Sequence, residues 1–142
     1  MLYNRLVNFH KLNNLIWVYN ANEVKSGVDP YETYYPGNDV VDILATDVYS
    51  EGFNQINYDQ LLALAGNKPI ALGEVGAAPS VEKLREQPRW TWFMSWGDLE
   101  SGGFGSGFKN VMALYNCEEV LTFEKLPWVK ITQPKIHYPI LK

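Results

Sequence analysis

One carboxylate stands out because of its place in the chain. Residues 69–76 read Pro-Ile-Ala-Leu-Gly-Glu-Val-Gly, and the apolar run stops at Glu74. In parallel α/β folds, catalytic groups lie just past the carboxyl ends of buried strands. A carboxylate held there can act as a nucleophile or exchange a proton with a substrate. The alternative is a structural role, in which Glu74 begins an ordinary loop and pairs with a nearby Lys or Arg.

Other polar and aromatic side chains follow apolar runs in the same way. They come from three further runs and are Asn20, Asp47, Tyr49, Trp96 and Asp98. Right-handed crossovers between parallel strands bring the carboxyl ends of all the strands to one edge of the sheet, so these side chains are expected to converge with Glu74. Packing alone explains such a convergence poorly. Tyr49 by itself could still be a half-buried aromatic residue at a strand end.

The elements that must position these groups alternate along the chain. Four apolar, β-favouring runs lie about 25 residues apart, as strands do in βα units. They are residues 15–19, 40–49, 69–74 and 89–96. Helical periodicity occurs before and between them and in the last part of the chain, at residues 2–9, 57–65, 80–86 and 108–115. Asn57 is expected to cap the second helix and Gly66 to end it. The pattern predicts an α/β fold with a parallel sheet. Trp17, Trp90 and Trp92 lie within strands and are expected in core or helix-facing positions.

The composition fits one compact domain, with 142 residues of which 46% are hydrophobic. The formal net charge of -4 and the lack of any Lys/Arg run argue against a nucleic-acid or anionic-membrane partner. No stretch reaches the ~20 apolar residues of a membrane span, and no signal peptide is recognisable at the start of the chain. Five Trp and nine Tyr offer ring faces on which sugars can stack.

The sequence suggests neither a metal nor a cofactor. The single cysteine, Cys117, excludes an internal disulfide and a cysteine-rich metal site. His10 and His137 have no metal-binding spacing. The glycine-rich segment 101–107 lacks the Gly-Lys-Ser/Thr element and the preceding apolar strand of a phosphate-binding loop.

Several motifs together resemble one enzyme family. They are Leu-Ile-Trp-Val-Tyr at 15–19, Tyr-Tyr-Pro-Gly-Asn-Asp-Val-Val-Asp at 34–42, Asp-Val-Tyr at 47–49, Lys-Pro-Ile-Ala-Leu-Gly-Glu-Val-Gly at 68–76 and Trp-Phe-Met-Ser-Trp at 92–96. In order and spacing they are similar to the C-terminal half of a family 26 glycoside hydrolase, over roughly residues 2–126. The family consists of clan A (β/α)8 barrels, mostly endo-β-1,4-mannanases. The resemblance implies a partial (β/α)8 TIM barrel of about four βα units, corresponding to strands five to eight. Residues 1–142 would then be a single C-terminal half-barrel fragment.

The resemblance also implies roles for the residues at the strand ends. Glu74 matches the catalytic nucleophile, and Tyr49 matches the tyrosine that hydrogen-bonds and orients it. Trp96 matches the aromatic floor under the sugar that is cleaved. Asp47, two positions before Tyr49, is a substrate-binding candidate. Asn20 and Asp98 are further substrate-binding candidates at the same edge.

One catalytic residue of the family has no counterpart here. A retaining glycosidase needs a second carboxyl group about 5 Å from the nucleophile, which protonates the leaving oxygen and then activates water. In the family, this acid/base glutamate belongs to strand four, which would precede residue 1. Glu23, Glu32 and Glu51 lie in expected loops that follow no apolar strand, so none is expected to replace it.

These observations favour a retaining glycoside hydrolase half acting on β-1,4-linked mannan or a related plant polysaccharide. It would be weakly active or inactive alone, and would self-associate or require the missing N-terminal half. The full-length protein is expected to be secreted or at the cell surface. Two alternatives remain: a non-catalytic carbohydrate-binding half barrel, and a small flavodoxin-like α/β protein of unrelated function.

Overall fold

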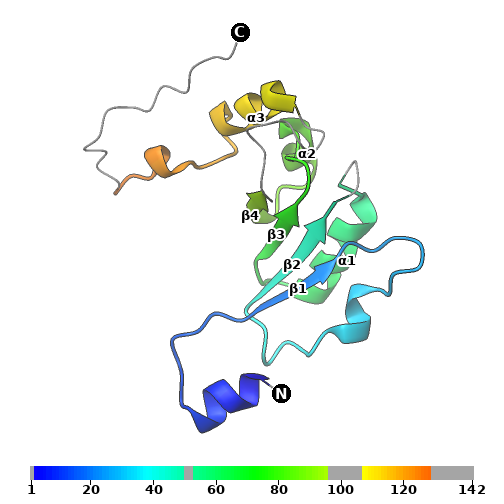
Figure 1. Cartoon of the computed structure of the whole chain (residues 1–142), viewed down its shortest axis with the longest axis vertical. Helices are drawn as coiled ribbons and strands as arrows, with labels where there is room; N and C mark the ends of the chain where they lie inside the picture. Colours follow the sequence, from blue (N-terminus) through cyan, green and yellow to red (C-terminus); the bar gives the residue numbers. More distant parts are fainter. Residues whose placement is uncertain (1, 50–52, 96–106, 129–142) are drawn as a thin grey trace.

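The centre of the molecule is a four-stranded parallel sheet. The computed structural model describes residues 2–49, 53–95 and 107–128. The strands are β1 (Val18–Asn22), β2 (Ile43–Val48), β3 (Ile70–Val75) and β4 (Trp90–Ser95). They are ordered β1-β2-β3-β4 across the sheet, as Figure 1 shows. Because every pair of neighbours is parallel, the carboxyl ends of all four strands lie at one edge. The expected α/β architecture is confirmed.

Helices of several lengths connect and flank these strands. They are the π-helical η1 (Asn4–Phe9), the 3-10 helix η2 (Tyr31–Tyr34), α1 (Gln55–Ala65), α2 (Val81–Glu86), α3 (Gly107–Asn116) and the 3-10 helix η3 (Phe123–Lys125). None of the helices in the described part of the chain is long and apolar enough to cross a membrane. Figure 1 shows η1 at one end of the sheet and α3 at the other.

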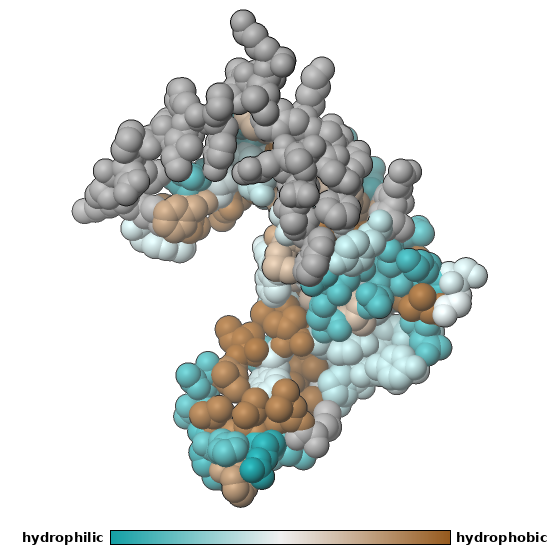
Figure 2. Space-filling view, in the orientation of Figure 1, coloured by the Kyte–Doolittle hydropathy of each residue, from teal (hydrophilic) through white to brown (hydrophobic). Residues whose placement is uncertain are grey.

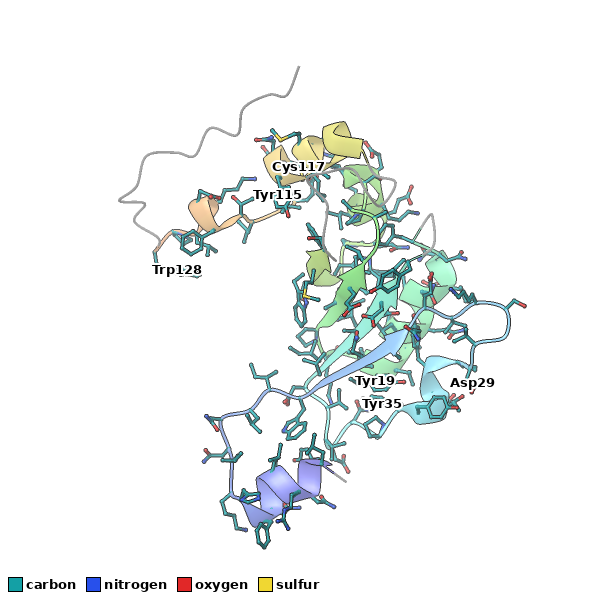
Figure 3. All side chains as sticks on the ribbon, viewed as in Figure 1. Tyr19, Asp29, Tyr35, Tyr115, Cys117 and Trp128 are labelled. Carbon is teal, nitrogen blue, oxygen red and sulfur yellow. The ribbon has the colours of Figure 1, made fainter. Side chains whose placement is uncertain are left out.

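The main core lies between the sheet and α1. Leu44 of β2, Ile70 of β3 and Leu61 of α1 are fully buried there. Each buried side chain of this size stabilises the fold by about 1.5–3 kcal/mol. The rings of Tyr19 and Tyr35 lie 5.3 Å apart beside this core (Figure 3). The core face of the sheet is therefore the face covered by α1.

The first strand begins later than its apolar run. Residues 15–19 were the predicted strand, whereas β1 covers Val18–Asn22. The register with β2 starts at Val18, opposite Ile43. Ile16 is 72% exposed and Leu15 is 39% exposed, so the described residues leave the start of the apolar run largely exposed. The start of β1 is therefore determined by its pairing with β2 and not by where its apolar run begins.

The expected cap of the second helix is wrong. The helix begins earlier, with Asn54 at the N-cap position. Asn57 is buried inside α1, and its side-chain oxygen accepts hydrogen bonds from Val24 N and from the Tyr31 hydroxyl. Gly66 does end the helix, with φ of 59°.

The face of the sheet opposite α1 is exposed along its two outer strands. Trp90 packs in the core as predicted, but Trp92 is 38% exposed, and the prediction of a core or helix-facing position is wrong for this residue. Met94 and Val18 are also exposed. They alternate along their strands with Phe93 and Tyr19, which are half-buried and pack against the core. This face is called the inner face below. Figure 2 shows a hollow on one side of the molecule, with apolar surface along its border.

Candidate active site

A break in the regular pairing of β2 and β3 determines where Glu74 points. Thr46 pairs with Leu72, but the next residue, Asp47, pairs with Glu74, so Gly73 is an extra residue in β3. Leu72 is buried in the core, and strict alternation would turn the residue two positions later to the same face. An extra residue reverses the alternation. Glu74 therefore shares the inner face with Asp47.

Gly73 also leaves room for two neighbouring side chains. A Cβ atom at this position would lie 2.1 Å from Oδ1 of Asn20 and 3.0 Å from Oδ1 of Asp47. In the space that is left, Asn20 Nδ2 donates a hydrogen bond of 2.8 Å to Asp47 Oδ1. The Asn20 amide on β1 and the Asp47 carboxylate on β2 thus form a hydrogen-bonded pair next to the backbone of Gly73 in β3.

Tyr49 reaches Glu74 from the end of β2. Its hydroxyl donates a hydrogen bond to Glu74 Oε2. This bond to a carboxylate is the main reason that the pKa of Tyr49 is raised to about 12, because it stabilises the neutral phenol. Gly76 makes room for the tyrosine ring, since a Cβ there would lie 2.9 Å from Tyr49 Cδ1. The backbone of this segment is held by Gly76 N, which donates to Val48 O at 2.9 Å.

Asp47 and Glu74 form a site with two carboxylates. The pKa of Asp47 is raised, first by its partial burial and further by the charge of Glu74, while the hydrogen bond from Asn20 acts in the opposite direction. The structural alternative for Glu74 was an ion pair with Lys or Arg. The ion pairs among the described residues do not include Glu74.

The structure brings four of the six predicted site residues together: Asn20, Asp47, Tyr49 and Glu74. Asn20 lies in the middle of β1 and not after its end, because the strand begins and ends later than predicted. Trp96 and Asp98 lie outside the described residues. No group of three or more His, Cys, Asp or Glu side chains that could hold a metal is found in the described ranges.

Sequence reasoning missed the contribution of Glu23. It was expected in a loop that follows no strand, but it directly follows β1 and is only 3% exposed. Its Oε1 accepts a hydrogen bond of 3.1 Å from the backbone N–H of Tyr49. The available signal was the same as for Glu74, a carboxylate just past a strand. This signal could not be recognised because the predicted strand ends at residue 19, three residues before the end of β1 at Asn22.

Comparisons with known proteins agree with this geometry. The sequence model of Glycosyl hydrolase family 26 matches residues 1–125. A mannan endo-1,4-beta-mannosidase of Thermothelomyces thermophilus is 40% identical over 131 residues, which cover 89% of this chain and 26% of that protein. The chain thus spans about a quarter of the length of this curated relative.

Solved structures show the same relationship. GH26A from Muricauda sp. superposes with a TM-score of 0.77 and 46% identity, over 88% of this chain and 42% of that one. The GH26-CBM35 β-(1,4)-mannanase of Podospora anserina gives a TM-score of 0.73 and 38% identity, over 89% of this chain and 28% of that one. These relatives are (β/α)8 barrels, and the present chain covers part of one. The chain belongs to glycosyl hydrolase family 26.

Proposed function

We propose that this chain carries the nucleophile, Glu74, of a retaining hydrolase of β-1,4-linked mannan and lacks the acid/base residue. The observation that carries the proposal is the hydrogen bond from the Tyr49 hydroxyl to Glu74 Oε2 at the carboxyl edge of the sheet. The relatives at 40% and 38% identity are named as a mannan endo-1,4-beta-mannosidase and a β-(1,4)-mannanase. Family membership and site geometry therefore support the same chemistry.

The geometry suits a nucleophile. Tyr49 occupies Oε2 of Glu74, which leaves Oε1 to attack the anomeric carbon of the sugar. The new bond joins Glu74 to the sugar, and the bond to the leaving oxygen breaks. That oxygen must receive a proton from a second carboxyl group about 5 Å away, which we place in the part of the barrel that this chain does not supply. Asp47, held by Asn20, would accept hydrogen bonds from sugar hydroxyls beside the nucleophile.

The inner face supports the proposal of a half barrel. Val18 and Met94 are 45% and 47% exposed on the first and last strands of the sheet. In a complete barrel this face is the packed interior. We propose that further barrel strands, or a second copy of this chain, cover it. Because the substrate is a polymer, the whole protein would act outside the cell, and neither nucleic acid nor membrane would be its partner.

The test uses a substrate that does not need the missing acid. In a 2-deoxy-2-fluoro-mannoside that carries a dinitrophenolate leaving group, the dinitrophenolate departs without being protonated while the sugar bonds to the carboxylate, so the nucleophile can react without an acid catalyst. Intact-mass analysis should show one added sugar, mapping to Glu74 and absent in Glu74→Ala. Glu82→Ala, at an exposed position in α2, should still form the adduct. An unmodified parent protein would refute Glu74 as a working nucleophile in this chain.

A second candidate function is carbohydrate binding without cleavage. It is favoured by the exposed aromatic rings of Trp92 and Tyr34, which are 38% and 72% exposed. Mannan binding that is measurable by calorimetry, survives Glu74→Ala and is accompanied by no sugar adduct would support this function over the first.

A further inference from the structure

Glu23 is a buried carboxylate whose position is fixed from both sides. Of the carboxylates in the described part of the chain, it alone is buried, at 3% exposure. Its own backbone N–H donates to Asp47 O at 3.0 Å. The next backbone N–H, of Val24, donates to Asn57 Oδ1 at 2.7 Å. The backbone at Glu23 is therefore attached to both β2 and α1.

The side chain of Glu23 continues the pairing between β1 and β2. The register of the two strands ends at Asn22 opposite Asp47. Beyond this point Glu23 Oε1 accepts the backbone N–H of Tyr49 at 3.1 Å, where a longer strand would have offered a carbonyl oxygen. Lys25 Nζ lies 3.6 Å from the same oxygen. Burying a carboxylate is costly unless it is paired and hydrogen-bonded, and here both conditions are met.

The contact lies at the base of the Tyr49 side chain. Glu23 accepts a hydrogen bond from the backbone N–H of Tyr49. The Tyr49 ring lies against Gly76, where there is no side chain, and the Tyr49 hydroxyl donates to Glu74. Tyr49 is 47% exposed, so little packing holds its ring from the solvent side. Its main chain must therefore be fixed if the hydroxyl is to stay on Glu74.

We propose that Glu23 is a positioning residue, which fixes the backbone of Tyr49 and thereby keeps the Tyr49 hydroxyl on Glu74. For its catalytic meaning, this inference rests on the proposed role of Glu74. The contact itself can be tested without any reaction.

The first measurement is hydrogen exchange of the Tyr49 amide in 15N-tyrosine-labelled protein, with the resonance assigned by its loss in Tyr49→Phe. The parent amide should be protected, and Glu23→Ala should speed its exchange about tenfold or more. Glu23→Gln keeps an acceptor oxygen and should retain the protection. Glu32→Ala, an exposed glutamate in η2, is the control and should leave the amide unchanged. An unprotected Tyr49 amide in the parent would overturn the proposal, even if Glu23→Ala failed to fold.

The second measurement shows whether Glu23 keeps the Tyr49 hydroxyl on Glu74 or only holds the Tyr49 backbone in place. In protein labelled with 3-fluorotyrosine, whose phenol is more acidic, 19F NMR follows the ionisation of Tyr49. If Glu23 keeps the hydroxyl on Glu74, Glu23→Ala should lower the pKa of Tyr49 by about one pH unit and Glu23→Gln should not. Glu23→Asp, which shortens the side chain and keeps the charge, replaces Glu23→Ala if the latter does not fold. A Tyr49 pKa that stays at its parent value would leave Glu23 with a structural role only and overturn the proposal.

The third measurement links the contact to the reaction. Glu23→Ala should slow formation of the fluoromannosyl adduct about tenfold without weakening binding of the reagent, and Glu23→Gln should restore the rate. If the parent forms no adduct, the proposed function fails, but the two NMR measurements still decide whether Glu23 positions Tyr49.

Discussion

The Tyr49 hydroxyl donates a hydrogen bond to Glu74 Oε2 across the carboxyl ends of β2 and β3. Two glycines make this contact possible. The extra residue Gly73 turns Glu74 to the inner face, and Gly76 makes room for the tyrosine ring. The contact thus depends on backbone features of β3 as much as on the two side chains that form it.

Tyr49→Phe tests the contact directly. The ring and its packing remain, but Glu74 loses the hydrogen-bond donor that, in the proposed function, orients it for attack. We expect the rate of fluoromannosyl adduct formation to fall about tenfold, with little loss of stability because the hydroxyl is partly exposed. The matched control is Tyr34→Phe, which removes an exposed hydroxyl bonded to Asp29 and should leave the rate unchanged. Equal rates in parent and Tyr49→Phe would contradict the orienting role.

Gly76→Ala should act through the same hydroxyl. The new methyl group would lie 2.9 Å from Tyr49 Cδ1, so the ring must move towards solvent. Because the ring is partly exposed and can move, we expect roughly 1 kcal/mol or less of lost stability but a slower adduct rate, about as slow as in Tyr49→Phe. In the double variant with Tyr49→Phe, the rate should fall no further, because the contact is already lost. An additional fall would mean that Gly76 acts by another route.

Gly73→Ala should disrupt the neighbouring pair. A Cβ atom 2.1 Å from Asn20 Oδ1 would force that side chain away from Asp47. The lost hydrogen bond should cost about 1 kcal/mol in urea unfolding. In an Asn20→Ala background the same substitution should cost less, because the clashing atom is gone. Independent, additive losses would show that the clash lies elsewhere.

Asp47→Asn tests the electrostatics of the site by its pH dependence. Burial and the charge of Glu74 raise the pKa of Asp47 in the folded state, so its ionisation there is disfavoured. The folded state therefore favours the protonated form of Asp47. The stability that this preference gives the parent is fully present at low pH and is lost as the pH rises through the raised pKa of Asp47. Asparagine cannot ionise and keeps an oxygen for Asn20. The stability of Asp47→Asn relative to the parent should increase between about pH 3 and pH 7 in urea unfolding.

The control for this experiment is Asp39→Asn, at an exposed position outside the site. It should show no such increase. A stability difference for Asp47→Asn that does not change with pH would mean that burial and Glu74 do not affect the ionisation of Asp47.

The parallel α/β fold, the four strands and the grouping around Glu74 could be predicted from the sequence, because buried parallel strands are continuous apolar runs that end at polar residues. The bulge at Gly73 could not, because a glycine within a strand indicates equally a bulge, a bend or a close approach of another group. The range of β1 was misplaced for a related reason: its pairing partner, not its apolar content, determines where it starts.

The contributions of Glu23 and Asn57 required the three-dimensional structure. Both side chains reach backbone N–H groups that are distant in sequence, at Tyr49 and Val24 respectively. Sequence patterns indicate local capping and amphipathic faces, so Asn57 before a helical run was interpreted as an N-cap. Hydrogen bonds between distant segments leave no periodic signal.

The exposed inner face should make the isolated chain self-associate. Val18 and Met94 lie on its first and last strands, where uncovered apolar surface and unpaired strand edges favour contact with another chain. Sedimentation velocity should show dimers or larger species of the parent. Replacing both residues by lysine should weaken this association about tenfold or more, since two charges would have to be buried. The control is the pair Leu121→Lys and Phe123→Lys, which are also apolar and are more exposed, at 72% and 68%, but lie beyond α3 and not in the sheet. If both pairs reduce association equally, general surface hydrophobicity drives it and not the open barrel face. If only Val18 and Met94 matter, the inner face of the sheet is the interaction surface, as the proposal that further barrel strands or a second copy cover it requires.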